Sequence, residues 1–184
     1  MNSTPTSEDS TPRRPGWWSK LNEHEHRQHY VLLCVLLWSI LSFLFVSHFV
    51  FGAVEVQGRS MESTLHDGNR HVVNRWVYHF RDPRRGEMIM LNDHIDESLC
   101  VKRIVALPGE LVELKQGKVY VDGQPLPERY LSAGVRTWPL KFGAQPLRVP
   151  RAHYFVLGDN RDDSVDSRMY GPLDREDILG LISP

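Results

Sequence analysis

One uninterrupted apolar segment constrains this chain more than any other feature. From Tyr30 to Phe51 it contains no Asp, Glu, Lys or Arg, and a helix of this length covers the roughly 30 Å hydrocarbon core of a bilayer. A buried core helix would be shorter and would show a polar face. A cleavable signal peptide would also have a shorter apolar region, and Phe51-Gly52-Ala53 puts a bulky residue at the third position before a cut. We therefore expect an uncleaved transmembrane anchor over residues 30–53.

The segments on either side of this run differ in polarity and charge. Residues 1–29 are polar and rich in Ser, Thr and Pro, so they cannot bury enough apolar area to fold, and we expect a flexible tail with solvated histidines. The positive-inside tendency predicts that this tail is cytoplasmic and that residues 54–184 form a domain on the outer side of the membrane. The basic residues that flank the run are Arg13, Arg14, Lys20 and Arg27 before it, and Arg59 and Arg70 after it.

Composition excludes several classes of protein. Hydrophobic residues make up 41% and charged residues 24%, as in an ordinary globular domain, and a net charge of -1 gives no basic face for nucleic acid. A mean hydropathy of -0.38 is too low for a polytopic membrane protein. Two cysteines, Cys34 and Cys100, cannot build a disulfide framework or a four-thiolate metal site. The acidic loop at 159–164 resembles a calcium loop only superficially, so we expect neither a metal nor another cofactor.

After the anchor the chain is typical of a mainly β domain. Short apolar runs bounded by Gly, Pro, Asp or Asn predict strands over residues 71–78, 87–91, 100–107 and 153–157. Residues 110–121 predict a hairpin that turns at Gln116-Gly117, and Asp122-Gly123 predicts another tight turn. The expected architecture is a single N-terminal transmembrane helix followed by a compact β-rich domain.

Two residues have the chemistry of a nucleophile and a base. Ser60 lies in the Gly-containing segment Gly58-Arg59-Ser60-Met61, a few residues beyond the anchor. Lys102 lies inside an apolar strand, where alternation places it with Ile104 on one face. Burial disfavours the charged form of a lysine, and a neutral amine can act as a general base. On these residues alone, an ordinary turn serine and an edge-strand lysine stay the simpler interpretations.

A third segment, residues 158–168, follows an apolar strand and is dense in hydrogen-bonding side chains. A solvated Asx-rich turn is one interpretation. The mixture of Asp and Arg also suits a partly buried network in which the two satisfy each other. The segment reads Gly158-Asp159-Asn160-Arg161-Asp162-Asp163-Ser164-Val165-Asp166-Ser167-Arg168.

Taken together, these segments resemble the bacterial type I signal peptidases, the membrane-anchored Ser/Lys leader peptidases of the S26-type family. The family pattern Ser-Met-x-Pro-Thr-Leu is similar to Ser60-Met61-Glu62-Ser63-Thr64-Leu65, and the Arg-Gly-Asp/Glu segment to Arg85-Gly86-Glu87. The lysine-bearing strand and its Leu-Pro-Gly turn resemble residues 102–110, and residues 153–168 match most closely. The order and spacing agree from about Val56 to Gly180.

The resemblance implies a role for each matching residue. Ser60 would be the nucleophile and Lys102 the general base, a variant of the serine triad without histidine. Ser164 would orient the lysine, Asp166 and Arg168 would form a supporting ion pair, and Asp159 and Arg161 would brace the same loop. The substrate pockets would be lined by Met61, Leu65 and Val101, for which core packing is the alternative.

The resemblance also implies partners and a location. The substrates would be exported preproteins with a small-x-small cleavage site, bound as an added β-strand. The enzyme would be a single-pass protein of the bacterial inner membrane, with its catalytic domain on the periplasmic side, and the export translocon is a candidate partner. We also predict that an apolar surface meets the lipid bilayer; its candidate residues are Trp76, Phe80, Trp138 and Phe142.

Three positions depart from the family pattern. Ser63 stands where Pro is usual, which removes a constraint on the turn that aims Ser60. Gly58 occupies a position where some members have a serine that donates to the oxyanion, and Asp163 replaces a usual Asn. Three other functions stay open: a narrow-substrate peptidase of a conjugation or pilus system, a silent signal-peptide-binding relative, and an autoproteolytic repressor relative, against which the anchor argues.

Overall fold

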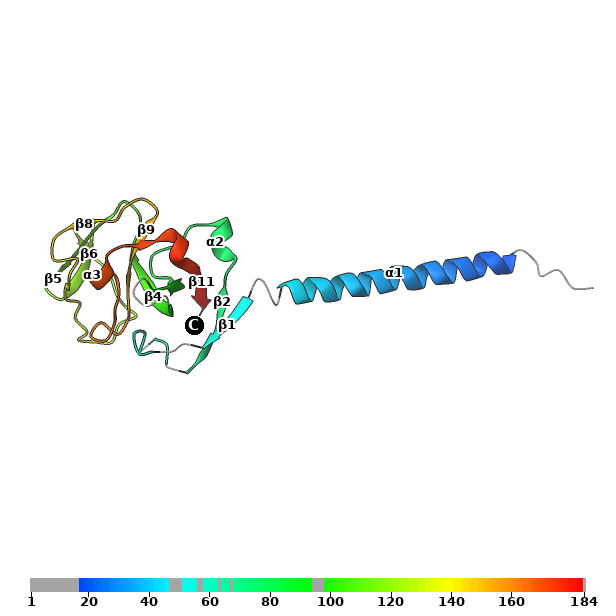
Figure 1. The fold of residues 1–184 in the computed structure, drawn as a ribbon, viewed down its shortest axis with the longest axis horizontal. Helices are drawn as coiled ribbons and strands as arrows, with labels where there is room; N and C mark the ends of the chain where they lie inside the picture. The colour runs from blue at the N-terminus through cyan, green and yellow to red at the C-terminus, as the bar shows by residue number, and fades with distance from the viewer. Residues whose placement is uncertain are drawn as a thin grey trace, which may run out of the picture. The chain divides into compact units, whose positions relative to one another are not determined.

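The computed structural model describes residues 17–46, 51–55, 58–62, 64–66, 68–93 and 98–183. Ser63 and the first part of the predicted tail lie outside these residues. The chain divides into an N-terminal unit that ends at Phe45 and a C-terminal unit that begins at Val46 (Figure 1).

The N-terminal unit is one helix, α1 (Trp17–Phe45). Its stretch from Arg27 to Phe45 is long and apolar enough to cross a membrane, with a mean hydropathy of 1.8. The helix begins well before Tyr30, so the prediction of a flexible tail through residue 29 is wrong from Trp17 onward. Pro15-Gly16 is the last helix-breaking pair before the helix, and several good helix formers lie in the turns that follow, among them Lys20, Leu21 and Glu23.

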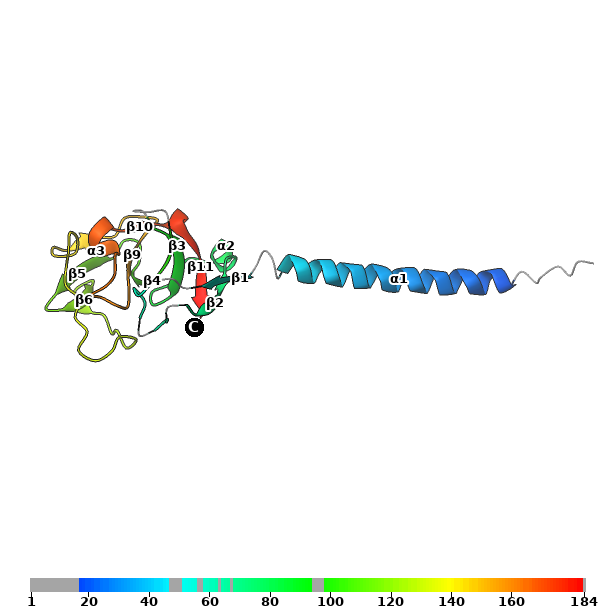
Figure 2. The same cartoon turned by 60° about the horizontal axis from the view of Figure 1, so that its bottom comes forward.

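The C-terminal unit is built on two antiparallel sheets. The larger has seven strands in the order β1-β2-β11-β3-β4-β9-β10, and the smaller has four in the order β7-β6-β5-β8. The smaller sheet lies at the opposite end of this unit from β1 and β2 (Figures 1 and 2). The strands of the larger sheet are β1 (Phe51–Glu55), β2 (Arg70–Asn74), β11 (Ile178–Ser183), β3 (Met88–Asn92), β4 (Leu99–Ala106), β9 (His153–Leu157) and β10 (Leu173–Asp174). Those of the smaller sheet are β7 (Gln124–Pro125), β6 (Lys118–Val121), β5 (Leu111–Lys115) and β8 (Leu147–Arg148).

This architecture confirms the predicted mainly β class and the hairpin. β5 and β6 pair across Gln116 and Gly117, whose φ angles of 54° and 72° are both positive, as a two-residue type I′ turn requires. Asp122 and Gly123 repeat this geometry between β6 and β7. Strands β1 and β11 were not predicted, and Phe51–Ala53, expected at the end of the anchor, lie in β1.

The strand predicted over residues 71–78 is too long. β2 stops at Asn74, and the short helix α2 (Val77–Phe80) follows. The Asn74 side-chain oxygen accepts hydrogen bonds from the backbone N–H groups of Trp76 and Val77, each at 3.0 Å. This Asx turn satisfies donors at the start of the helix and ends the strand. The remaining short helices are α3 (Ser167–Tyr170) and the 3-10 helix η2 (Arg175–Asp177).

The buried side chains form three clusters, and one of them fixes the segment that carries Ser60. Met61 and Leu65, each 1% exposed, pack with Met88 and Met90 of β3 and with Val101 of β4. Burial of two such side chains contributes about 1.5–3 kcal/mol each. The turn between β1 and β2 is therefore held against the centre of the large sheet.

Candidate active site

The Ser60 turn, residues 58–62 and 64–65, is a compact series of backbone turns. Glu62 N–H donates to the Arg59 carbonyl at 3.0 Å, and Leu65 N–H donates to the Met61 carbonyl at 2.9 Å. Gly58 opens the turn with a φ of 106°, a region that favours glycine. Ser60 is half-buried between these anchored neighbours.

Side-chain and backbone hydrogen bonds attach this turn to the Gly158 loop, residues 158–168. The Asn160 N–H donates to the Ser60 carbonyl at 3.0 Å, and the Asn160 side-chain amide donates to the Arg59 carbonyl at 3.0 Å. The Thr64 hydroxyl donates to the Asp159 carboxylate at 2.6 Å. Segments about 100 positions apart in the sequence are thus joined at the serine itself.

Gly158 is the point at which the two segments come closest. A Cβ at this position would overlap the Ser164 hydroxyl and would lie 2.5 Å from the Ser60 carbonyl oxygen. Real Cβ atoms essentially never approach other atoms so closely, so a glycine is required here by space rather than by φ. The Ser60 carbonyl and the Ser164 hydroxyl therefore both lie against Gly158, in the space that a side chain would need.

The strand register relates Lys102 to the same point. Arg103 pairs with Leu157 and Ile104 with Val156, so continuing the register by one residue sets Gly158 across from Lys102. Paired residues of an antiparallel ladder point to the same face. Lys102 thus lies on the strand beside the end of β9, near the point where the Ser164 hydroxyl and the Ser60 carbonyl meet Gly158.

The surroundings of Lys102 are apolar. Lys102 is 3% exposed, and it pairs directly with Ile89 of β3. Ile89, Ile104 and Val156 share its face of the sheet, and all are fully buried. The side chain therefore lies in a largely apolar setting, away from bulk water.

The Ser164 hydroxyl has unused hydrogen-bonding capacity. Its oxygen is buried, and it has no hydrogen-bond partner in the part of the chain that the structure describes. Buried hydroxyls are normally satisfied, and an unpaired one calls for an explanation. The amine of Lys102, on the strand next to β9, is a group that such a hydroxyl could bind.

Two buried ion pairs hold the Gly158 loop. Arg168 binds Asp166 through both carboxylate oxygens, at 2.8 and 2.9 Å, and Asp166 also accepts from the Gly158 N–H at 3.1 Å. Arg103 binds Asp159 at 2.6 Å and donates to the Gly86 carbonyl at 2.7 Å. These four charged side chains are at most 9% exposed. Such bidentate pairs fix direction as well as distance, so the backbone around Gly158 is rigidly placed.

Comparison with known proteins identifies the group to which this arrangement belongs. The family model described as "Signal peptidase, peptidase S26" matches residues 27–183. The chain belongs to this family. It is 35% identical to a signal peptidase I of Bacillus amyloliquefaciens over 173 residues, which are 89% of this chain and 82% of the relative. It is 38% identical to signal peptidase I T of Bacillus subtilis (strain 168), over 71% of this chain and 70% of the relative.

A solved structure is also similar to this chain. The crystal structure of a signal peptidase I from Enterococcus faecalis is 30% identical to the chain, with a TM-score of 0.49. The match covers 56% of this chain and 98% of that one.

The predicted pocket residues of this S26-family chain lie in the core. Met61 and Leu65 are each 1% exposed, and Val101 is 7% exposed. The structure brings the three together in one cluster, but it leaves them almost no surface on which a substrate could rest. Their role as pocket lining stays a prediction.

Arg161 has partners that could not be predicted from the sequence. Its guanidinium binds Glu128 at 2.6 Å and the Thr137 hydroxyl, and its Nε–H donates to the Gly158 carbonyl at 2.9 Å. Tyr130, near Glu128, lies against Arg103. These residues come from the irregular segment between β7 and β8. No local spacing relates them to Arg161, so only the folded structure could reveal them.

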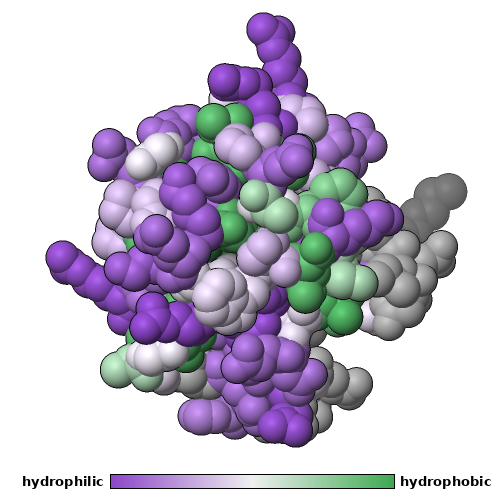
Figure 3. All heavy atoms as spheres, turned by 90° about the vertical axis from the view of Figure 1, so that its left-hand side faces the viewer, coloured by the Kyte–Doolittle hydropathy of each residue, from purple (hydrophilic) through white to green (hydrophobic). Residues whose placement is uncertain are grey.

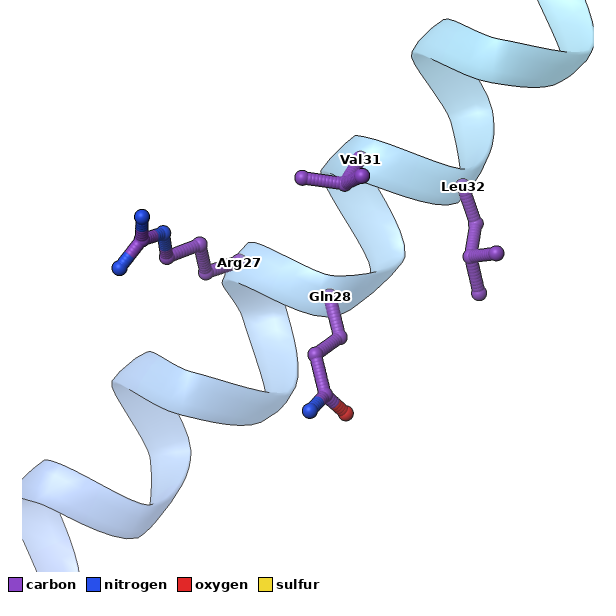
Figure 4. Close-up of a pocket in the computed structure, with 4 residues that line it drawn as sticks. All are labelled: Arg27, Gln28, Val31 and Leu32. Atoms are coloured by element: carbon purple, nitrogen blue, oxygen red, sulfur yellow. The ribbon is translucent and has the colours of Figure 1, made fainter.

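Two hollows of the described surface lie away from these residues. One is on α1, where Arg27, Gln28, Val31 and Leu32 project outward from a single helix rather than closing over a chamber (Figure 4). Another, of about 400 Å³, is lined by residues 141–147. In the described ranges no group of three or more His, Cys, Asp or Glu side chains could hold a metal ion.

The four residues predicted to meet the bilayer fall on two segments. Trp76 and Phe80 lie on and beside α2, 37% and 78% exposed, with their rings 6.2 Å apart. Trp138 is 55% exposed, whereas Phe142 is half-buried. At the end of the unit that bears the four-stranded sheet, polar side chains cover most of the face and separate small apolar groups (Figure 3). Contact with lipid stays a prediction for all four residues.

Proposed function

We propose that this protein is a membrane-bound serine endopeptidase that removes N-terminal signal peptides from exported preproteins, with Ser60 as nucleophile and Lys102 as general base. Membership of the signal peptidase family supports the reaction class. The observation that carries the assignment to these residues is the packing of the Ser60 carbonyl and the Ser164 hydroxyl against Gly158, beside the strand that holds buried Lys102.

The reaction would run in two stages. The neutral amine of Lys102 accepts the Ser60 hydroxyl proton as the oxygen attacks the scissile carbonyl, and the backbone N–H of Ser60 donates to the developing oxyanion. Such a donor contributes roughly 3 kcal/mol to transition-state stabilisation. The Lys102 ammonium then protonates the leaving amine, which departs as the new N-terminus of the mature protein. Water, deprotonated by the same amine, finally hydrolyses the ester that joins the signal peptide to Ser60.

The supporting residues would act on the position of the base. The buried Ser164 hydroxyl, which has no partner in the described part of the chain, would accept a hydrogen bond from the Lys102 amine and orient it. The Asp166–Arg168 pair holds the Gly158 N–H and the start of α3, so it would keep Ser164 in register. Asp159 and Arg161 would brace the same loop through Arg103 and the Gly158 carbonyl.

The helix α1 supports the proposal that the substrates are exported preproteins. We propose that its Arg27–Phe45 stretch anchors the chain in the bacterial inner membrane, with the N-terminus cytoplasmic and the β-rich unit on the periplasmic side. An exported preprotein emerging from the translocon would bring its small-x-small junction to that surface. An added β-strand is the mode of capture that an exposed peptide-binding edge favours.

The test is cleavage of a labelled preprotein with an Ala-x-Ala junction by the full chain in detergent. We expect Lys102→Ala and Lys102→Arg to lose at least about 1,000-fold in kcat, because neither leaves a neutral amine at the site. Lys118→Ala, at an exposed lysine of β6, is the matched control and should retain wild-type turnover. Lys102→Ala activity within tenfold of the wild type would overturn the assignment. A wild type inert on several preproteins would favour a narrow-substrate or signal-peptide-binding role.

A further inference from the structure

We infer that Glu128 and Tyr130 are positioning residues for the reaction. They form a clamp on Arg103 and Arg161, the two arginines that fix the position of the Gly158 peptide. This inference rests on the proposed function, since it concerns the same site. Neither residue belongs to the segments that resemble the family motifs, and both lie in the irregular stretch between β7 and β8.

The first arm of the clamp runs through Arg161. Its side chain is 0% exposed, and Glu128, itself 11% exposed, binds it at 2.6 Å. The Nε–H of the same guanidinium donates to the Gly158 carbonyl at 2.9 Å. The direction of that N–H is fixed by what holds the other end of the planar guanidinium. Glu128 therefore controls where the Gly158 carbonyl sits.

The second arm runs through Tyr130 and Arg103. The Tyr130 ring lies 4.1 Å from the Arg103 guanidinium, and its hydroxyl donates to Glu128 at 2.9 Å. Burial, reinforced by the Glu128 carboxylate, raises the pKa of the Tyr130 phenol, so the hydroxyl stays a donor. Arg103 follows Lys102 in β4 and binds both oxygens of the Asp159 carboxylate. One carboxylate, that of Glu128, thus links both arms.

Both arms end on neighbouring positions of one short segment. Arg161 holds the carbonyl of Gly158, and Arg103 holds the side chain of Asp159, which also accepts from Thr64 of the Ser60 turn. Gly158 has no spare space, because a Cβ there would meet both Ser60 and Ser164. A shift of this peptide would therefore move the nucleophile relative to the base. A misplacement of about 1 Å can cost about 100-fold in rate.

A positioning role predicts a specific kinetic signature. Glu128→Gln keeps the shape of the side chain but removes the charge that holds Arg161, so we expect kcat to fall about 10- to 100-fold while KM stays within about threefold. Tyr130→Phe keeps the ring on Arg103 and loses only the hydroxyl, and we expect a smaller fall, about 3- to 10-fold. The matched control is Glu113→Gln, whose partner Lys115 is 45% exposed; it should behave as the wild type.

The experiment measures kcat, KM and folded fraction of these full-length variants beside the wild type and Lys102→Ala. Hydrogen exchange of residues 158–161 on the same samples should rise at least about tenfold in Glu128→Gln and stay unchanged in Glu113→Gln. Unchanged exchange overturns the inference whatever happens to the substrate. The inference is also overturned by a wild-type kcat in both variants, by a rise in KM alone, or by a loss of rate that only follows loss of folded protein. If the wild type is inactive or Lys102→Ala is active, the proposed function fails instead.

Discussion

Two networks of arginine and carboxylate groups in this protein use the same chemistry in different surroundings. The first holds the Gly158 loop, where Asp159 and Asp166 have side chains that are 0% exposed. The second joins Arg81 and Glu87 beside α2, with side chains 27% and 17% exposed and a 2.6 Å contact between them. The distances are similar, so the difference between the two lies in burial and in what the partners hold.

The partly exposed network of Arg81 and Glu87 closes a surface turn. Glu87 accepts from the Arg81 guanidinium, from the Arg84 N–H at 2.9 Å and from the Tyr78 hydroxyl at 3.0 Å. Water can replace much of what each of these donors supplies. In the Gly158 loop the charges have no such substitute, and their partners include the backbone N–H and carbonyl groups on which the position of Ser60 depends. Because these charged groups are buried, each must keep its hydrogen-bond partner. The site is therefore held in a precise geometry, but it tolerates fewer substitutions.

The largest expected effect follows from removing a charge within the buried network. Asp166→Asn leaves the Arg168 guanidinium buried and uncompensated, and breaking a buried pair costs about 3–5 kcal/mol. We expect the free energy of unfolding in urea to fall by that amount and preprotein cleavage to be lost. Asp162→Asn, at an exposed aspartate of the same loop, should change neither quantity. Equal stability of the two variants would mean that the buried Asp166 matters no more to the fold than the exposed Asp162.

The next effect tests space rather than charge. In Gly158→Ala the new methyl group would overlap the Ser164 hydroxyl and press on the Ser60 carbonyl. Overpacking of this kind costs about 1–3 kcal/mol, and the forced displacement of Ser60 should lower kcat about 100-fold. Circular dichroism should show the two sheets unchanged. Wild-type kcat in a folded Gly158→Ala protein would mean that the proposed nucleophile, Ser60, does not depend on this contact.

The partly exposed network of Arg81 and Glu87 should respond much less. Arg81→Ala leaves Glu87 with its hydrogen bonds from the Arg84 N–H and the Tyr78 hydroxyl, so we expect a loss of at most about 1 kcal/mol in the free energy of unfolding. Preprotein cleavage should be unchanged. A loss as large as that of Asp166→Asn would show that exposure does not separate the two networks.

The smallest effect is a dependence of stability on pH. Burial raises the pKa of Glu87, but hydrogen bonds from Arg81, the Arg84 N–H and Tyr78 outweigh burial and hold the pKa below its ordinary value. The unfolded chain has a value of about 4.3 for this group. Its contribution to stability is therefore complete above that pH and disappears as the pH falls through the lower folded value. The stability difference between wild type and Glu87→Gln should shrink between neutral pH and about pH 3, and a difference that grows would contradict the sign.

The sequence predicted those parts of the fold that depend on local patterns. The hairpin at Gln116-Gly117 follows from turn chemistry, and the strands around Lys102 and Phe155 follow from apolar runs with clear boundaries. The apolar helix was predicted from composition, but its start was placed too late. The helix extends through the polar residues 17–29 and begins at Trp17. The composition of these residues alone indicated a tail.

Structure that depends on distant partners could not be predicted in this way. Strand β11 reads as an ordinary C-terminal segment until β2 and β3 are present to pair with it. Asn74 ends a strand that propensity would have continued, because its side chain captures two backbone N–H groups. At the site, the motif resemblance supplied Ser60, Lys102 and Ser164. Glu128 and Tyr130 became visible only through their contacts with Arg161 and Arg103.

The most direct test of the account is single-turnover cleavage of an Ala-x-Ala preprotein by a matched series of serine variants. Ser60→Ala should leave no detectable product, Ser164→Ala should lose about 10- to 100-fold because the base is less well oriented, and Ser132→Ala, at an exposed serine, should match the wild type. Cleavage by folded Ser60→Ala within tenfold of the wild-type rate would contradict the assignment of Ser60 as the nucleophile.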